Sequence, residues 1–307
     1  MVFAALLLLA PRGAGALRGC GAFRGAALRS LATSASEAPK FDAEMTAAYK
    51  QIAESHRHPA GPWTAMAEAV AARVGAGARV LDLASGPGEP AATIARALPD
   101  ASVVATDVSE DMVAGAAEAT RDLANVEVRL ADAQALDAFG DGSFDAVTCC
   151  YGYMFPTDKP AALAETLRVL KPGGVLVATT WDSLDIAALS RDIMTRVLGE
   201  APPPPALNPM SLSEPGLFDG LVKAAGFSDV RQTTSTYPFD LGTDRDFQFR
   251  VGTIILKQAL DDMDDAGAWD RAKDGFWASI DKYAETGPDG TLSLPANTFR
   301  LTIATKP

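Results

Sequence analysis

The segment Val80–Ala91 combines an acidic residue, two glycines and the start of a helix in an order that can bind a nucleotide-like ligand. Its apolar residues carry Asp82 near their end, and Gly86-Pro-Gly88 follows. Glycines permit a tight turn and a close approach of a ligand to the backbone, and the first turn of the next helix has free N–H groups. The segment therefore predicts a strand, a cofactor-binding turn and a helix.

The same segment narrows the choice of cofactor. Residues Gly86 to Ala91 fit the pattern Gly-x-Gly-x-x-Ala, which is typical of dinucleotide-binding turns. However, Asp82 stands where a dinucleotide would place its diphosphate, and a carboxylate there repels anionic groups and favours a cationic ligand. A nicotinamide-dependent oxidoreductase is therefore the weaker interpretation.

Apolar segments and helix-forming segments alternate around this turn. Strands are predicted at 78–83, 102–106, 126–130, 144–150 and 175–181, and helices at 41–55, 63–73, 89–98, 109–123 and 161–170. Such alternation predicts an α/β fold with a doubly wound, Rossmann-like parallel sheet. Ligands in these sheets bind beyond the carboxyl ends of the strands, and Asp82, Asp107, Asp132 and Cys150 all fall at such ends.

Lys171-Pro-Gly-Gly174 is predicted to end the preceding helix before the fifth strand begins. The alternation of strands and helices then changes after residue 181. Further on, we expect a helix at 214–225 and two last strands at 228–239 and 297–305. The remaining segments, 182–215 with its run of prolines and the helical segment 243–286, are predicted to be insertions that form a lid over the pocket.

The N-terminal segment 1–39 differs in composition from the rest. It contains Arg12, Arg18, Arg24 and Arg29 but one acid, Glu37, and it is rich in Ala, Gly, Leu and Ser. This composition is typical of an organelle transit peptide, and we expect a mitochondrial rather than a plastid destination. The alternatives are the front half of a two-part plastid signal, since the apolar stretch 3–10 is too short to span a bilayer, and a disordered N-terminus. Residues 40–307 then form the functional domain.

Charge and cysteine content limit the partners. The chain has 27 basic and 39 acidic residues, a net charge of −12. An acidic surface disfavours nucleic acid and anionic membranes, so we expect a small-molecule partner, no nucleic acid and no stable membrane insertion; the oligomeric state stays open. Cys149 and Cys150 are adjacent, which suits neither a disulfide nor a metal site. His56 and His58 alone do not form a zinc site, and we expect no metal.

Five motifs occur in order between residues 81 and 176. They are Leu81-Asp-Leu-Ala-Ser-Gly-Pro-Gly88, Val104-Ala-Thr-Asp-Val-Ser-Glu-Asp-Met112, Ala131-Asp-Ala133, Phe144-Asp-Ala-Val-Thr-Cys-Cys-Tyr-Gly-Tyr-Met-Phe-Pro156 and Leu167-Arg-Val-Leu-Lys-Pro-Gly-Gly-Val-Leu176. Over residues 63–181 the chain resembles the class I S-adenosylmethionine-dependent methyltransferases of the small-molecule type, similar to the ubiquinone/menaquinone C-methyltransferases. The resemblance implies a seven-stranded sheet whose last strand runs antiparallel.

The resemblance also implies roles for individual residues. Asp107 would accept hydrogen bonds from both ribose hydroxyls of S-adenosylmethionine, and Asp82 would lie near the ammonium group. Asp132 and the Ala133 N–H would contact the adenine edge. The full set of expected cofactor-binding residues is Asp82, Ala84, Gly86, Gly88, Asp107, Val108, Met112, Asp132, Ala133 and Cys150. The alternative role for the acidic residues of this set is to cap a helix or to form a turn. The alternative for Met112 is packing in the core.

The methyl acceptor is less well determined. Candidate catalytic groups are His56, Tyr151 and Tyr153, although an acceptor without an acidic proton needs no base; a solvent-exposed loop is the alternative for His56. The candidate substrate-contacting residues are Tyr49, Trp63, Met154, Phe155 and Trp181, for which core packing is the alternative. The main hypothesis is a small-molecule methyltransferase acting on a quinone-ring carbon or on the sulfur or oxygen of a small acid. Alternatives are an S-methyltransferase of algal sulfonium-osmolyte synthesis and a non-catalytic cofactor-binding subunit.

Overall fold

The computed structural model describes residues 53–202, 208–253, 256–263 and 265–307. The expected transit peptide at 1–39, Tyr49, most of the helix expected at 41–55 and Pro203–Pro205 lie outside the described residues. The predictions made for them therefore remain predictions.

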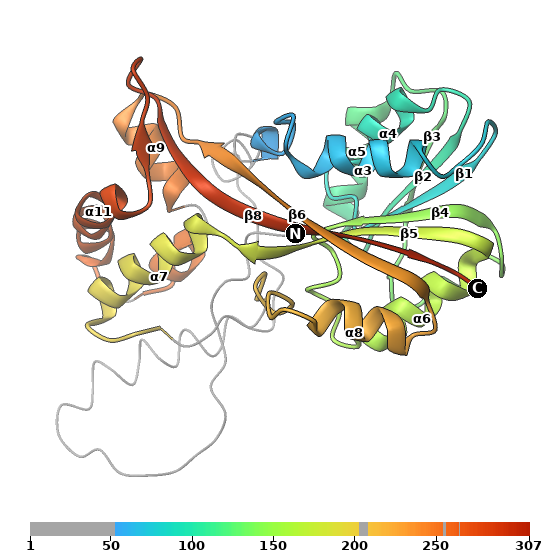
Figure 1. The fold of residues 1–307 in the computed structure, drawn as a ribbon. Helices are drawn as coiled ribbons and strands as arrows, with labels where there is room; N and C mark the ends of the chain where they lie inside the picture. Colours follow the sequence, from blue (N-terminus) through green and yellow to red (C-terminus); the bar gives the residue numbers. More distant parts are fainter. Residues whose placement is uncertain (1–52, 203–207, 254–255, 264) are drawn as a thin grey trace, which may run out of the picture.

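One twisted sheet forms the centre of the molecule (Figure 1). Its strands are β1 (Arg79–Leu83), β2 (Ser102–Asp107), β3 (Val126–Leu130), β4 (Phe144–Cys150), β5 (Leu170–Ser183), β6 (Ser228–Asp240), β7 (Glu285–Thr286) and β8 (Leu292–Thr305). The order is β3-β2-β1-β4-β5-β8-β6, with β7 paired to β8. The pairs from β3 to β5 are parallel, whereas β8 runs antiparallel to both β5 and β6. The expected α/β fold with an antiparallel last strand is confirmed; with the short β7, the sheet has eight strands among the described residues instead of the expected seven.

Helices cover both faces of this sheet. In Figure 1, α3 (Pro62–Ala71), α4 (Ala91–Ala97) and α5 (Glu110–Thr120) lie on one face, while α6 (Lys159–Val169) and α8 (Leu217–Ala224) lie on the other. The strands β1, β2 and β4 are buried almost throughout, as expected when a parallel sheet is covered on both faces. Strand order reverses between β1 and β4, so the ligand-binding edge is expected at the carboxyl ends of these two strands.

The segment Lys171–Gly174 departs from its prediction. We expected it to separate a helix from a strand, but it lies inside β5, which already begins at Leu170. Leu170 pairs with Phe144 and Val175 with Ala146, so the residues between them bulge out of the register. The Gly173 N–H donates to the Lys306 carbonyl. A Gly-containing bulge can therefore continue a strand where composition alone suggests a break.

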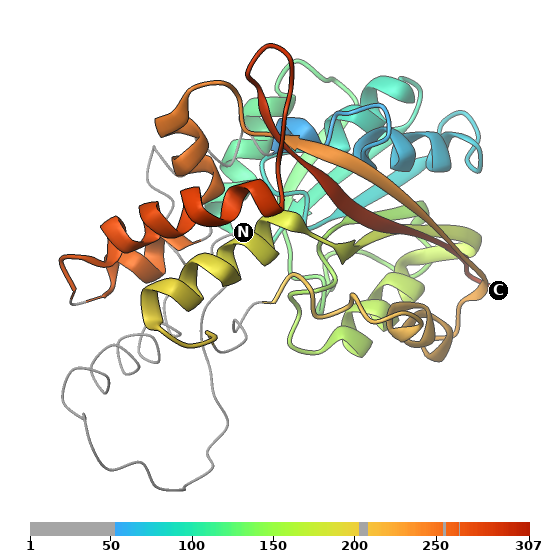
Figure 2. The same ribbon diagram turned by 60° about the vertical axis from the view of Figure 1, so that its left-hand side comes forward.

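The two predicted insertions pack against each other. The first contains α7 (Asp185–Leu198); the second contains α9 (Arg245–Gly252), α10 (Lys257–Asp261), α11 (Ala268–Ser279) and the 3-10 helix η3 (Ile280–Lys282). Figure 2 shows α7 and α11 side by side, at the end of the long β6–β8 pair. Asp192 of α7 accepts hydrogen bonds from Lys282 Nζ and Tyr283 Oη at 2.8 and 2.7 Å. The lid function of these helices stays a prediction.

Within the described ranges, every helix is too short or too polar to cross a bilayer.

Candidate functional site

The glycine turn after β1 is held in place by the carboxylate that ends β2. Asp107 Oδ2 accepts a hydrogen bond from the Gly86 N–H at 3.0 Å, and Oδ1 accepts one from the Ser109 N–H at the same distance. Gly88 has a φ of +110°, and a Cβ on it would lie 3.2 Å from the Ala116 Cα of α5. The turn therefore needs glycine at 88, and Asp107 ties it to the neighbouring strand.

Asp82 is a buried carboxylate with one unused oxygen. Its Oδ1 accepts a hydrogen bond from Thr148 Oγ1 at 2.5 Å, whereas Oδ2 has no partner among the described residues. Burial raises the pKa of Asp82 to about 7, because removal from water disfavours the charged form. This enclosed, unpaired carboxylate lies directly before the glycine turn, so its charge would attract the ammonium group of a cofactor bound at that turn.

This burial has a measurable effect on stability. In the unfolded chain Asp82 loses its proton near its ordinary pKa of 3.8, but in the folded protein it does so only near 7. The free energy of unfolding therefore falls as the pH rises from about 4 to about 7, and the loss is complete above that range. Asp82→Asn keeps the acceptor for Thr148 and removes the charge. We expect it to stabilise the ligand-free protein by on the order of 2–4 kcal/mol at pH 8 and hardly at pH 4.

Chemical denaturation at both pH values tests this prediction, with Asp100→Asn in an exposed turn as the control. Calorimetry should also show weaker S-adenosylmethionine binding by Asp82→Asn, since the ammonium loses its charged partner. Equal stabilisation at pH 4 and pH 8 would contradict the assigned burial cost.

The ends of β2 and β3 leave apolar surface uncovered. The side chains of Val108 and Leu130 are 55% and 52% exposed. Nearby, Met112 and Ala133 are half-buried, and Asp132 accepts a hydrogen bond from the Gln134 N–H at 2.8 Å. An adenine ring could cover this surface, as expected for Val108; the sequence analysis did not select Leu130, which reads there as an ordinary strand residue.

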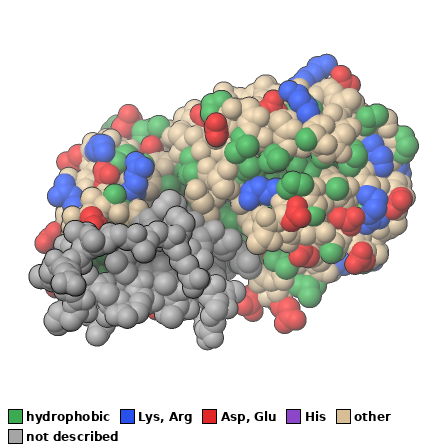
Figure 3. All heavy atoms as spheres, turned by 90° about the horizontal axis from the view of Figure 1, so that it is seen from below, with side chains coloured by type: hydrophobic (Ala, Val, Ile, Leu, Met, Phe, Trp, Pro, Cys, Tyr) green, Lys and Arg blue, Asp and Glu red, His purple; other side chains and the backbone are tan. Residues whose placement is uncertain are grey.

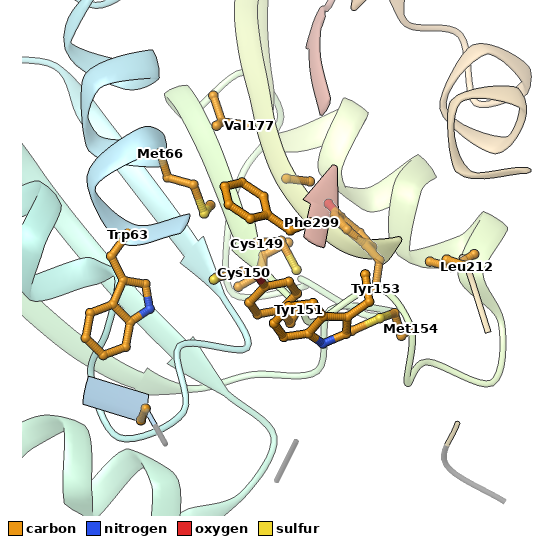
Figure 4. Close-up of a cluster of buried hydrophobic side chains, with 14 of the residues drawn as sticks. Trp63, Met66, Cys149, Cys150, Tyr151, Tyr153, Met154, Val177, Leu212 and Phe299 are labelled. Carbon is orange, nitrogen blue, oxygen red and sulfur yellow. The ribbon is translucent and has the colours of Figure 1, made fainter. Parts of the chain in front are cut away.

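A pocket of about 230 Å³ lies beside the glycine turn. His56, Trp63, Cys150 and Tyr151 form part of its lining, together with Ala84, Ser85 and Pro87 of the turn. Figure 4 shows Trp63 at the start of α3 and Cys150 and Tyr151 at the end of β4. Cys149 and Cys150 are both buried free thiols, consistent with the expected reduced core. The structure thus brings three predicted acceptor-site residues, His56, Trp63 and Tyr151, to one cavity next to the cofactor turn.

His56 is buried inside an aromatic cluster and not exposed on a loop, so the alternative of a solvated histidine is wrong. Its ring contacts the rings of Trp63, Tyr151, Trp181, Tyr237 and Phe239, with centroids 5.5–6.1 Å apart. Burial lowers the pKa of His56 to about 3, which keeps the imidazole neutral. Its Nδ1 is 2.8 Å from Tyr237 Oη, a residue that the sequence analysis did not select.

Tyr153 is not brought to the pocket. Its hydroxyl bonds to Thr166 Oγ1 of α6 at 2.7 Å, and its ring packs on Phe218 of α8. Met154 is buried, and its carbonyl accepts from Ser211 Oγ, while Phe155 is half-buried against the core. Figure 4 places Tyr153 and Met154 on the side of Tyr151 away from Trp63. The geometry thus assigns Tyr153 to packing against α6 and α8 and leaves Met154 and Phe155 outside the pocket lining.

Trp181 lies behind the pocket wall. It stacks on Tyr151 with centroids 3.9 Å apart and planes 7° from parallel. It therefore supports Tyr151 from the sheet side and is not in the pocket lining.

The charged groups around the pocket are paired with one another. Glu89 accepts from Arg57 Nη2 at 2.8 Å and from Arg96 Nη1 at 3.5 Å, and Arg57 also pairs with Glu54. None of these residues stood out in the sequence. In the part of the chain that the structure describes, no group of three possible metal ligands occurs.

Comparisons with known proteins agree with this geometry. The family model described as "Methyltransferase domain" matches residues 80–174. The chain is 39% identical over 125 residues to the ubiquinone/menaquinone biosynthesis C-methyltransferase UbiE of Shewanella halifaxensis, covering 39% of this chain and 47% of that protein. It is 43% identical over 100 residues to the demethylmenaquinone methyltransferase of Thermus thermophilus, covering 32% and 45%. The chain thus spans about half the length of these curated relatives.

Among solved structures, the YcgJ protein of Bacillus subtilis is similar with a TM-score of 0.50 and 22% identity, covering 80% of this chain and 97% of that one. That likeness concerns the fold. The matched segment 80–174 contains the glycine turn, Asp107, Asp132 and the end of β4. The chain therefore carries, over this segment, a methyltransferase domain of the class I, S-adenosylmethionine-dependent type.

Proposed function

We propose that the protein transfers a methyl group from S-adenosylmethionine to a small-molecule acceptor bound in the pocket beside His56, Trp63 and Tyr151. The observation that carries this proposal is the pair of carboxylates at the carboxyl edge of the sheet. Asp107 is fixed against the Gly86 N–H, and Asp82 keeps one buried oxygen without a partner. The first suits the ribose hydroxyls and the second suits the ammonium.

When bound, S-adenosylmethionine supplies an activated methyl group on a sulfonium. The protein's own contribution is to hold the acceptor in line and to exclude water. The pocket suits this task because aromatic rings form one wall and the glycine turn forms another. The exposed Val108 and Leu130 offer the apolar surface on which adenine would rest.

The acceptor that we propose is a ring carbon of a quinol. The names of the curated relatives support this choice, as both act in ubiquinone or menaquinone biosynthesis or on demethylmenaquinone. The aromatic lining of the pocket supports it as well, since flat rings stack well on Trp and Tyr. A nucleic-acid acceptor fits the net charge of −12 poorly, and the face in Figure 3 shows acidic and basic side chains interspersed, without a basic stripe.

The test is to incubate the protein with methyl-deuterated S-adenosylmethionine and a mixture of demethylmenaquinol and small thioether acids, followed by mass spectrometry. We expect the label on the quinol ring. Label on sulfur would replace the quinol by a thioether acceptor. Binding of S-adenosylhomocysteine without transfer to any compound in a metabolite extract would support a non-catalytic subunit and contradict the proposed activity.

A further inference from the structure

Three buried groups form a hydrogen-bonded chain that ends at the pocket. Tyr151 Oη lies 3.1 Å from Tyr237 Oη, and Tyr237 Oη lies 2.8 Å from His56 Nδ1. All three side chains are almost completely buried. They come from distant parts of the sequence: His56 precedes α3, Tyr151 follows β4, and Tyr237 lies on β6.

The other ring nitrogen of His56 is left for a ligand. Nε2 has no hydrogen-bond partner within the described ranges. It is also not completely enclosed by protein atoms. His56 lines the pocket together with Trp63 and Tyr151. Nε2 is therefore the nitrogen that a molecule in the pocket can reach.

The direction of the hydrogen bonds among Tyr151, Tyr237 and His56 decides which imidazole nitrogen of His56 carries the proton. If Tyr151 donates to Tyr237 and Tyr237 donates to Nδ1, both hydroxyl protons have acceptors, and the imidazole proton is on Nε2. If Nδ1 donates instead, Tyr237 Oη accepts its proton, and one of the two hydroxyl protons has no acceptor among the described residues, since the Tyr151 hydroxyl hydrogen-bonds only to Tyr237. A buried donor without an acceptor costs free energy. In the first arrangement the remaining donor is Nε2–H of His56, which lines the pocket, where water or a ligand can accept its proton, so this arrangement is favoured.

We propose that Tyr151 and Tyr237 hold His56 in the tautomer protonated on Nε2, so that this N–H donates a hydrogen bond to an oxygen atom of the methyl acceptor. The inference rests on the proposed function and makes it more specific. The acceptor must carry an oxygen close to the atom that is methylated. A thioether sulfur is only a weak hydrogen-bond acceptor and would leave the N–H unsatisfied.

The surroundings of His56 support a neutral donor over a general base. Burial among aromatic rings lowers the pKa of His56 and opposes formation of an imidazolium. The charged side chains that line the same pocket, Glu54, Arg57, Glu89 and Arg96, pair with one another. Tyr237 is in this scheme a positioning residue, because it acts on the acceptor only through His56.

Nitrogen NMR of the histidine rings tests the tautomer without any substrate. The chain contains two histidines, so His58→Gln leaves the His56 signals alone in the spectrum. At pH 7 we expect Nε2 to carry the proton and Nδ1 to act as acceptor. Tyr237→Phe should raise the population protonated on Nδ1, whereas Tyr153→Phe, which removes a buried hydroxyl bonded to Thr166, should not. A proton on Nδ1 in the His58→Gln protein would overturn the proposal.

A pair of probes tests recognition of oxygen. With S-adenosylhomocysteine present, 4-methylphenol should bind about fivefold more tightly than toluene, the value expected for one added hydrogen bond, and it should shift the Nε2 proton resonance. His56→Leu should abolish the preference, and His56→Gln, whose amide can donate, should retain part of it.

The two proposals fail in different ways. Absence of S-adenosylhomocysteine binding to the unaltered protein contradicts the proposed function. Normal S-adenosylhomocysteine binding, with equal affinity for the two probes or with no probe binding, overturns the role of His56 alone.

Discussion

Asp107→Ala is expected to weaken S-adenosylmethionine binding by tenfold or more in calorimetry. The carboxylate has two tasks: it accepts the Gly86 and Ser109 N–H groups at 3.0 Å each, and it is placed to accept the ribose hydroxyls. Hydrogen bonds to a charged group contribute about 1.5–3 kcal/mol each, and about 1.4 kcal/mol corresponds to a factor of ten in affinity. Alanine removes the ribose contacts and frees the glycine turn.

A milder variant separates the two tasks. Asp107→Asn keeps one carbonyl oxygen for a backbone N–H but removes the charge, so we expect an affinity between those of the unaltered protein and Asp107→Ala. Asp100→Ala, in the exposed turn before β2, should bind normally. If Asp107→Ala bound S-adenosylmethionine as well as the unaltered protein does, Asp107 would be a structural strand-end residue and the assigned cofactor site would be wrong.

The parallel half of the fold was predictable because its central strands are apolar segments and its edge strand β3 alternates apolar and polar residues. The predicted bounds of β3 and β4, Val126–Leu130 and Phe144–Cys150, agree with the structure. Burial on both faces requires the apolar composition of β4, whereas the partly exposed edge strand β3 needs only alternation. β5 was not predictable in full, because its first residues include the bulge at Gly173–Gly174, where the register is set by pairing with β4 and not by local composition.

The cofactor edge was predictable for a related reason. The carboxyl ends of neighbouring parallel strands meet at one edge of the sheet, so residues at the ends of β1 and β2 had to lie close together. The Gly86–Asp107 hydrogen bond is the result of that rule.

The aromatic cluster was not predictable in this way. Tyr237 bonds to His56 across 181 positions of sequence, and it reaches the site only because β8 inserts between β5 and β6. No local pattern encodes that insertion. Whereas Tyr237 was missed, Tyr153 was selected for the site and lies outside it. It was expected to accompany Tyr151, but Tyr151 has a φ of +54°, and the chain turns at Gly152, so the two tyrosines face different sides of the sheet.

Gly152→Ala is expected to lower both the free energy of unfolding and the affinity for the cofactor. Only the structure reveals this effect. A Cβ at 152 would overlap Cys149 Sγ and would lie 2.7 Å from Ala84 Cβ, both closer than van der Waals contact allows. Overpacking of this kind typically costs about 1–3 kcal/mol, and chemical denaturation should show the loss. Ala84 begins the turn that contains Gly86, so its displacement should also weaken S-adenosylhomocysteine binding. Gly220→Ala in α8, where a Cβ meets no atom within 4 Å, should instead leave the protein equally stable or stabilise it by up to about 1 kcal/mol.

A second substitution tests whether displacement of Ala84 in the glycine turn causes the loss of cofactor affinity. Ala84 has a φ of +53°, a left-handed conformation that glycine adopts without strain. Adding Ala84→Gly to Gly152→Ala therefore removes one of the two close contacts and suits the backbone of the turn. We expect the double variant to regain part of the lost affinity for S-adenosylhomocysteine, while the contact with Cys149 Sγ still lowers stability. Because Ala84 and residue 152 are neighbours, their effects should not add. If the double variant bound as weakly as Gly152→Ala alone, the close packing of the β4 end on the glycine turn would not control cofactor affinity.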